Sequence, residues 1–122
     1  MTSKELNLKL ILAIPEIKKT YIDEISWQDG DDTGSHIVYA DIFVPYIKRQ
    51  IITNNDKTLV RIFDFIEELL LINDEYINEV VALSVFEPLV LDDEIDKFLF
   101  IKHCKEKSLI IVQEIINNIL FS

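Results

Sequence analysis

The chain has only two glycines, Gly30 and Gly34, and both lie in one short acidic stretch, residues 27–36. Glycine is the residue that most readily adopts the backbone conformations of tight turns. A sheet of many short strands needs many such turns, so a chain this poor in glycine favours few and long elements. The same stretch holds the single tryptophan, Trp27, and it is where we expect the backbone to be irregular.

Outside that stretch, apolar residues recur at helical spacing. The clearest stripe, with intervals of three and four residues, consists of Leu59, Ile62, Phe63, Ile66, Leu69 and Leu70. The many isoleucines favour strands by propensity, but the period of 3.6 and the scarcity of turns outweigh them. We predict an all-α fold, either an irregular antiparallel helical bundle or a short HEAT-like stack of five to seven helices.

Polar caps and prolines mark the expected helix boundaries. Pro15 should kink or open a helix, Pro45 should kink or split one near Val44, and Pro88 should end or kink another. The segment from residue 75 is apolar on every side, which predicts a buried, central helix. The expected N-caps are Ser3, Asn55, Asn73–Asp74, Asp92–Asp93 and Ser108.

Length and charge limit the partners. At 122 residues and 49% apolar composition, the chain is expected to form a single helical domain over residues 1–122. Twenty-two acidic residues against twelve basic ones give a net charge of −10, which repels nucleic acids and anionic membranes. Basic partners or metal cations are favoured instead, although solubility alone is the preferred interpretation of the acidity.

The sequence also carries hints about its compartment. The single cysteine, Cys104, cannot form a disulfide within the chain, which predicts a reducing, cytoplasmic compartment. The first residues lack the basic and apolar regions of a signal peptide, and no apolar run reaches the roughly 18 residues of a membrane span.

The acidic stretch resembles a calcium-binding loop only in its first half. Asp29, Asp31 and Thr33 occupy the first three ligand positions, and Gly34 stands at the turn. The twelfth position, which should hold a bidentate glutamate, is Ala40. We therefore expect no calcium site, and no cofactor or metal elsewhere.

Other reactive side chains form no catalytic pattern. Asp41 and Glu87 lie in apolar runs and could act as bases, but pairing or exposure to solvent is the favoured interpretation. His36, His103 and Cys104 lack the spacing of a zinc site. The lysines beside Cys104 are expected to lower the pKa of its thiol, but no glycines are present nearby to form an oxyanion hole.

Three segments resemble a family of small, uncharacterised bacterial all-helical proteins, some of which occur among toxin-immunity gene clusters. The segments are residues 34–46 (GSHIVYADIFVPY), 61–67 (RIFDFIE) and 78–87 (NEVVALSVFE). The resemblance implies a helical, HEAT-like binding domain of unknown partner, and it implies no catalytic residues.

We therefore predict a non-enzymatic protein-binding domain, in particular a toxin-neutralising immunity protein. The predicted partner-binding residues are Trp27, Asp29, Asp31, Asp32 and His36. Packing of the Trp27 ring against Tyr21 or Ile25 is slightly favoured over a role as an anchor for the partner. The alternatives are a carboxylate- or metal-dependent enzyme centred on Asp29–Asp41 and a structural homo-oligomer.

Overall fold

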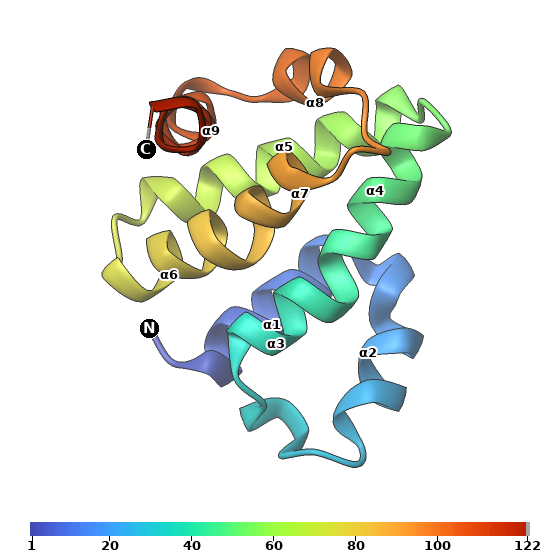
Figure 1. The fold of residues 1–122 in the computed structure, drawn as a ribbon. Helices are drawn as coiled ribbons and strands as arrows, with labels where there is room; N and C mark the ends of the chain where they lie inside the picture. The colour runs from blue at the N-terminus through green and yellow to red at the C-terminus, as the bar shows by residue number, and fades with distance from the viewer. Residues whose placement is uncertain (122) are drawn as a thin grey trace.

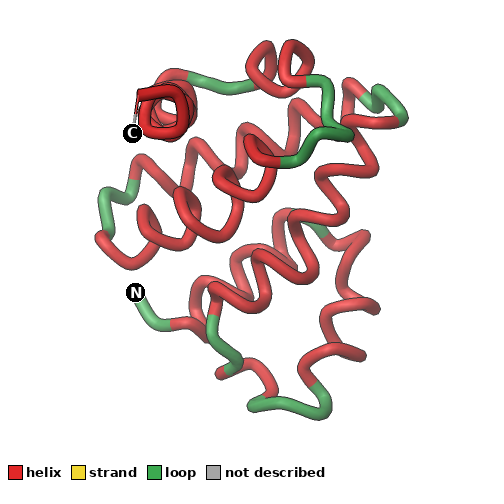
Figure 2. Tube along the Cα trace, viewed as in Figure 1, coloured by secondary structure: helices red, strands yellow, loops and turns green. Residues whose placement is uncertain are grey.

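The computed structural model describes the backbone of residues 1–121 and the side chains of residues 1–120, and it consists of helices joined by short loops (Figure 1). Seven continuous helices form a bundle, and the residues described include no strand (Figure 2). The all-α prediction is confirmed. The elements are α1 (Ser3–Ala13), η1 (Pro15–Ile17), α2 (Lys18–Ile25), η2 (Gly30–Asp32), α3 (Ser35–Val38), η3 (Tyr39–Phe43), α4 (Val44–Ile52), α5 (Asp56–Leu71), α6 (Glu75–Glu79), η4 (Val80–Phe86), α7 (Glu87–Leu91), α8 (Lys97–His103) and α9 (Glu106–Phe121).

Two of the long helices contain a proline and continue past it. Pro45 lies in α3–η3–α4, which runs without a break over residues 35–52, and Pro88 lies in α6–η4–α7, residues 75–91. Proline lacks an N–H and its ring crowds the carbonyl four residues earlier. The segment before each proline, η3 or η4, is π-helical, which widens the helix at that point. Of the predicted alternatives, a split near Val44 and a helix end at Pro88 are therefore wrong, because π-helical segments carry both helices past their prolines.

These two helices pack side by side at the centre of the bundle, where η3 contacts η4 (Figure 1). Helix α1 packs against α3, whereas α9 packs against α5 and α7. Phe43 and Phe86, the residues two before each proline, are both fully buried. The α6–η4–α7 helix is central, as predicted, because η4 contacts α3, η3 and α9, but it is not buried on every side, since Leu83 and Leu91 are more than half exposed. The buried apolar side chains form one cluster.

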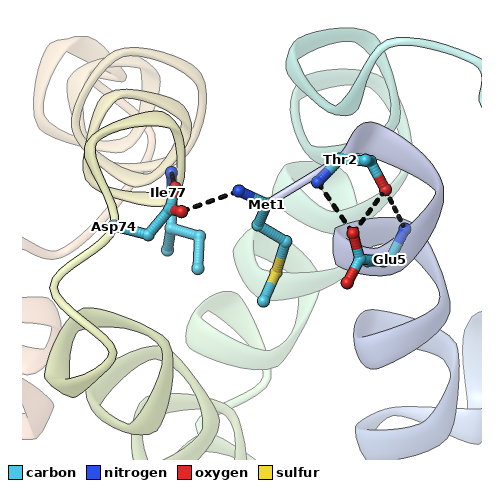
Figure 3. A network of polar contacts seen from close by, with 5 residues as sticks. All are labelled: Met1, Thr2, Glu5, Asp74 and Ile77. Atoms are coloured by element: carbon cyan, nitrogen blue, oxygen red, sulfur yellow. Dashed lines mark hydrogen bonds and ion pairs between the residues drawn. The ribbon is translucent and has the colours of Figure 1, made fainter.

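Side chains cap the N-termini of α1 and α6. Thr2, rather than the predicted Ser3, caps α1, and it forms a capping box with Glu5. Asp74 caps α6 as predicted, because its carboxylate accepts the backbone N–H of Ile77 at 3.1 Å. Figure 3 shows the same carboxylate receiving the amine of Met1 at 2.7 Å, which ties the start of α1 to the start of α6.

The last two helices begin at other residues than expected. Asp96, not Asp92 or Asp93, caps α8, since Asp92 instead bonds the N–H of Glu94 within a turn. Helix α9 begins at Glu106, two residues before the predicted cap, Ser108. Within residues 1–121 no helix has the length and apolarity that a membrane span requires.

Candidate functional site

The loop between α2 and α3 is fastened to α1 by one buried amide. Asn7 is fully buried on α1, and its side-chain N–H groups donate to the carbonyls of Asp31 at 3.1 Å and Thr33 at 2.7 Å. Its side-chain oxygen accepts the hydroxyl of Ser35 at 2.8 Å. One side chain thus bonds three loop residues and holds the loop in one conformation.

Further polar groups fix the middle of the loop and its end at α3. The backbone N–H of Ser35 lies 3.3 Å from the Ser3 hydroxyl and 3.2 Å from the Tyr76 hydroxyl, which are 2.7 Å apart. The buried Thr33 hydroxyl donates to the carbonyl of Gly30 at 2.7 Å. Gly30 itself has φ +60°, a left-handed conformation that favours glycine.

The outer surface of this loop carries an aromatic ring among carboxylates. Trp27 is 71% exposed, and Asp29 and Asp32 are exposed beside it in the chain. The favoured packing of Trp27 against Tyr21 or Ile25 is wrong. Tyr21 and Ile25 are buried in the core from α2, whereas Trp27 lies in the turn after α2 has ended, and most of its ring is in solvent.

Two of the predicted binding residues do not belong to this exposed surface. Asp31 is half-buried and accepts the hydroxyl of Tyr21 at 2.6 Å. Burial and the Asp31 carboxylate raise the pKa of Tyr21, so this hydroxyl remains a donor. The Nδ1 of His36 lies 2.6 Å from the Ser84 hydroxyl, and its ring meets Tyr76 edge-on, so His36 faces η4. We call the exposed residues Trp27, Asp29 and Asp32 the acidic Trp loop.

The candidate catalytic and metal-binding groups lie apart. In the part of the chain that the structure describes, no three His, Cys, Asp or Glu side chains gather as a metal site would require. Asp41 is exposed, in keeping with the favoured interpretation. The pKa expectation for Cys104 is wrong: burial, followed by the nearby Glu67 carboxylate, raises the pKa of the thiol to about 12. The neighbouring Lys105 instead forms an ion pair with Asp64.

The larger hollows of the surface lie elsewhere. One of about 430 Å³ lies between α9 and the facing ends of α5 and α6, another of about 360 Å³ lies between α7 and the end of α9, and a third of about 390 Å³ lies between residues 51–54 and residues 94–99. Their linings include Asn78 and Ile110 in the first, and Leu91 and Ile119 in the second. None of these hollows is lined by a residue of the acidic Trp loop.

Asn7 is the important residue that our reading of the sequence missed. It lies three residues before Leu10 and seven before Ile14, so it shares their core-facing stripe on α1. An amide at such a position must find hydrogen-bond partners inside the protein. That was the available signal, although the sequence did not show that the partners would be loop carbonyls.

Comparison with known proteins places the chain in a family. No curated protein and no solved structure matches it. A family model described as "Domain of unknown function (DUF7674)" matches residues 7–119, a range that begins at Asn7 and includes the acidic Trp loop and nearly all of α9. Because this match spans most of the sequence, the chain belongs to the DUF7674 family.

Proposed function

We propose that this chain is a non-enzymatic domain that binds a basic protein partner through the acidic Trp loop. The observation that carries the proposal is the 71% exposure of Trp27 on a loop whose backbone is bonded to α1. Tryptophan is enriched among the residues that dominate binding energy in protein interfaces. A loop that is already ordered loses little conformational entropy when a partner binds.

The charge of the loop favours a basic partner. Asp29 and Asp32 are exposed next to Trp27 in a chain of net charge −10. Complementary charge accelerates association and orients the partner, whereas a buried aromatic anchor mainly slows dissociation. Asp29 and Asp32 should therefore affect the association rate constant, and Trp27 the dissociation rate constant.

We further propose that the partner is a toxin and that the domain neutralises it in the cytoplasm. The support is the resemblance of residues 34–46, 61–67 and 78–87 to a family of bacterial, HEAT-like proteins, some of which occur among toxin-immunity gene clusters. The unpaired Cys104 is compatible with a reducing compartment. The toxin proposal depends on this resemblance, whereas the proposal that the acidic Trp loop binds a partner does not.

Binding kinetics on matched variants test the surface. The protein encoded by the adjoining gene is the first probe, and a protein captured from the native proteome is the second. Trp27→Ala should raise the dissociation rate at least about ten-fold, since loss of an anchor residue costs about 2 kcal/mol or more. The double variant Asp29→Lys, Asp32→Lys should slow association and weaken its dependence on salt.

Matched controls lie on another part of the surface. Phe98→Ala removes an aromatic ring that is 88% exposed, and Asp93→Lys with Glu94→Lys reverses two exposed charges. Both should leave the kinetics unchanged. Wild-type kinetics in Trp27→Ala would exclude the proposed surface, whereas failure of the adjoining protein alone to bind would exclude only the toxin proposal.

A further inference from the structure

A groove between α1 and the second half of α5 leaves apolar side chains in solvent. Its volume is about 220 Å³, and we call it the α1–α5 groove. The residues that line it are Lys9, Leu12, Ala13, Phe65, Glu68, Leu69 and Ile72. Leu12 is 86% exposed and Ile72 is 45% exposed. Exposed apolar side chains that gather at one place favour contact with another molecule.

The two charged side chains of the groove have opposite signs. Lys9 comes from α1 and Glu68 from α5, and both are exposed. In the part of the chain that the structure describes, neither of them belongs to an ion pair. Their neighbour Asp64, in contrast, is paired with Lys105. The groove therefore combines apolar surface with one positive and one negative charge that have no partner within these residues.

A patch that carries both signs can be complementary to itself. In a two-fold symmetric dimer the same patch of each copy meets the other, so Lys9 of one copy can face Glu68 of the other, and the reverse. The position also suits a lysine, because Glu68 lies in the last turn of α5, where the helix dipole is negative. Contact with a different protein would not require both charges in one patch.

Other surfaces of the molecule fit a second copy less well. The acidic Trp loop carries only carboxylates, so two copies of it would repel each other. The hollow between α7 and α9 is lined by Asp93 and Lys97, but the Lys97 ammonium already donates to the backbone carbonyls of Asp92 and Ile95. The α1–α5 groove is also smaller than the roughly 300–1,000 Å³ of small-molecule sites, which favours a protein side chain as its occupant.

We propose that the α1–α5 groove binds a second copy of this chain in a two-fold symmetric dimer. Leu12 and Ile72 of each copy are covered by the other, and two pairs of Lys9 with Glu68 join the copies. The net charge of −10 on each copy opposes association, so the dimer needs enough salt to screen this long-range repulsion. The dimer surface is separate from the acidic Trp loop and does not depend on the proposed partner binding.

Analytical ultracentrifugation of the whole chain at about 150 mM salt tests the proposal. The wild type should pass from monomer to dimer between about 50 μM and 1 mM. Leu12→Ser should weaken the dimer at least about ten-fold, because it removes an apolar side chain from both halves of the interface. Leu12 is too exposed to support the core, so the variant should remain folded. Phe98→Ser, at another exposed position, is the control and should dimerise as wild type does.

Charge reversals distinguish this interface from any other. Lys9→Glu and Glu68→Lys should each weaken the dimer at least about ten-fold, because each places like charges opposite each other at two positions. An equimolar mixture of these two variants should dimerise about as tightly as wild type, because opposite charges again face each other. Lys107→Glu and Glu114→Lys change the net charge equally on α9, and each should stay within about three-fold of wild type.

Three results would overturn the proposal. The first is a wild-type chain that remains monomeric at about 1 mM. The second is a dimer that Leu12→Ser does not weaken. The third is a mixture of Lys9→Glu and Glu68→Lys that associates as weakly as each variant alone. The second and third results would place the contact between copies on another surface.

Discussion

At the scale of residues, single polar groups in the core decide where irregular backbone lies. Asn7 is fully buried, and its side chain donates two hydrogen bonds to the loop and accepts one from it. The hydroxyl of Tyr39, on η3, donates to the carbonyl of Leu6, on α1, at 2.8 Å. A buried polar atom that loses its partner costs more than the bond contributes. The loop and α1 therefore depend on each other.

Replacement of Asn7 should test that dependence. Asn7→Ala leaves the carbonyls of Asp31 and Thr33 without this donor, and we expect a loss of about 2–3 kcal/mol in the free energy of unfolding. Urea denaturation measures the change. Asn117→Ala, at an exposed position of α9, is the control and should lie within about 0.5 kcal/mol of wild type. Equal stability of the two variants would show that the loop does not need this amide.

The two glycines should respond differently to the same substitution. Neither added Cβ would meet an atom within 4 Å, but Gly30 has φ +60° and Gly34 has φ −53°. Gly30→Ala should cost about 1–2 kcal/mol of stability through backbone strain. Gly34→Ala should be neutral or slightly stabilising, because alanine restricts the unfolded chain. Thermal melts of both variants check the expectation, and the reverse order would refute it.

At the scale of elements, helix ends are completed by side chains from other helices. The Glu67 carboxylate of α5 accepts the backbone N–H of Lys107 at 2.8 Å and that of Ser108 at 3.1 Å, at the start of α9. A carboxylate at this position bonds unpaired N–H groups and interacts favourably with the helix dipole. Helix α9 is thus capped by α5 rather than by its own sequence.

Loss of that cap should loosen α9. Glu67→Ala should lower the free energy of unfolding by about 1–2 kcal/mol and speed hydrogen exchange in the first turn of α9. The exposed neighbour Glu68 provides the control, and Glu68→Ala should change neither. If exchange in α9 is the same in both variants, the contact does not stabilise the helix.

An ion pair between elements should make stability depend on acid. Two nitrogens of Arg61 on α5 bond the carboxylate of Glu16 in η1, and the Tyr46 hydroxyl donates to it at 2.7 Å. The Arg61 contact, aided by Tyr46, lowers the pKa of Glu16 to about 2. A lowered carboxyl pKa stabilises the fold above the unfolded value of 4.5, and this contribution is lost as the pH falls from there toward about 2.

Glu16→Gln should therefore flatten the acid limb of the stability curve. Because both partners are more than one-third exposed, solvent screening limits the loss at neutral pH to about 0.5–1 kcal/mol. Denaturation between about pH 5 and 2 measures the slope. A variant with the same slope as wild type would show that Glu16 is not a source of the acid sensitivity.

At the scale of the whole molecule, excess negative charge opposes the compact state. The chain carries ten more acidic than basic residues, so repulsion among the acidic groups exceeds their attraction to the basic groups. Raising the salt concentration from about 10 mM to 150 mM should screen this repulsion and raise the melting temperature by a few degrees. Sodium and choline chloride should act alike. A fall in melting temperature would mean that the ion pairs outweigh the repulsion.

Local patterns in the sequence were enough to establish the class of fold. The spacing of Ile62, Phe63 and Ile66 reflects the helical period, and Asp74 caps a helix through a backbone N–H only three residues away. The spacing and the cap both depend on residues of a single helix, so they can be inferred without knowing which other helices pack against it. The acidic stretch was likewise recognised as irregular from its glycines, and its Trp27, Asp29 and Asp32 do lie on an exposed loop.

The tertiary structure decided what depends on residues far apart in the chain. Pro45 and Pro88 end no helix, because π-helical segments precede them, and these segments lie where the two helices contact each other. Asp31 and His36 are not part of the acidic Trp loop, because Asp31 is hydrogen-bonded to Tyr21 and His36 lies against Ser84. These outcomes follow from contacts between separate helices, and the helical period of one segment does not specify which other segment will face it.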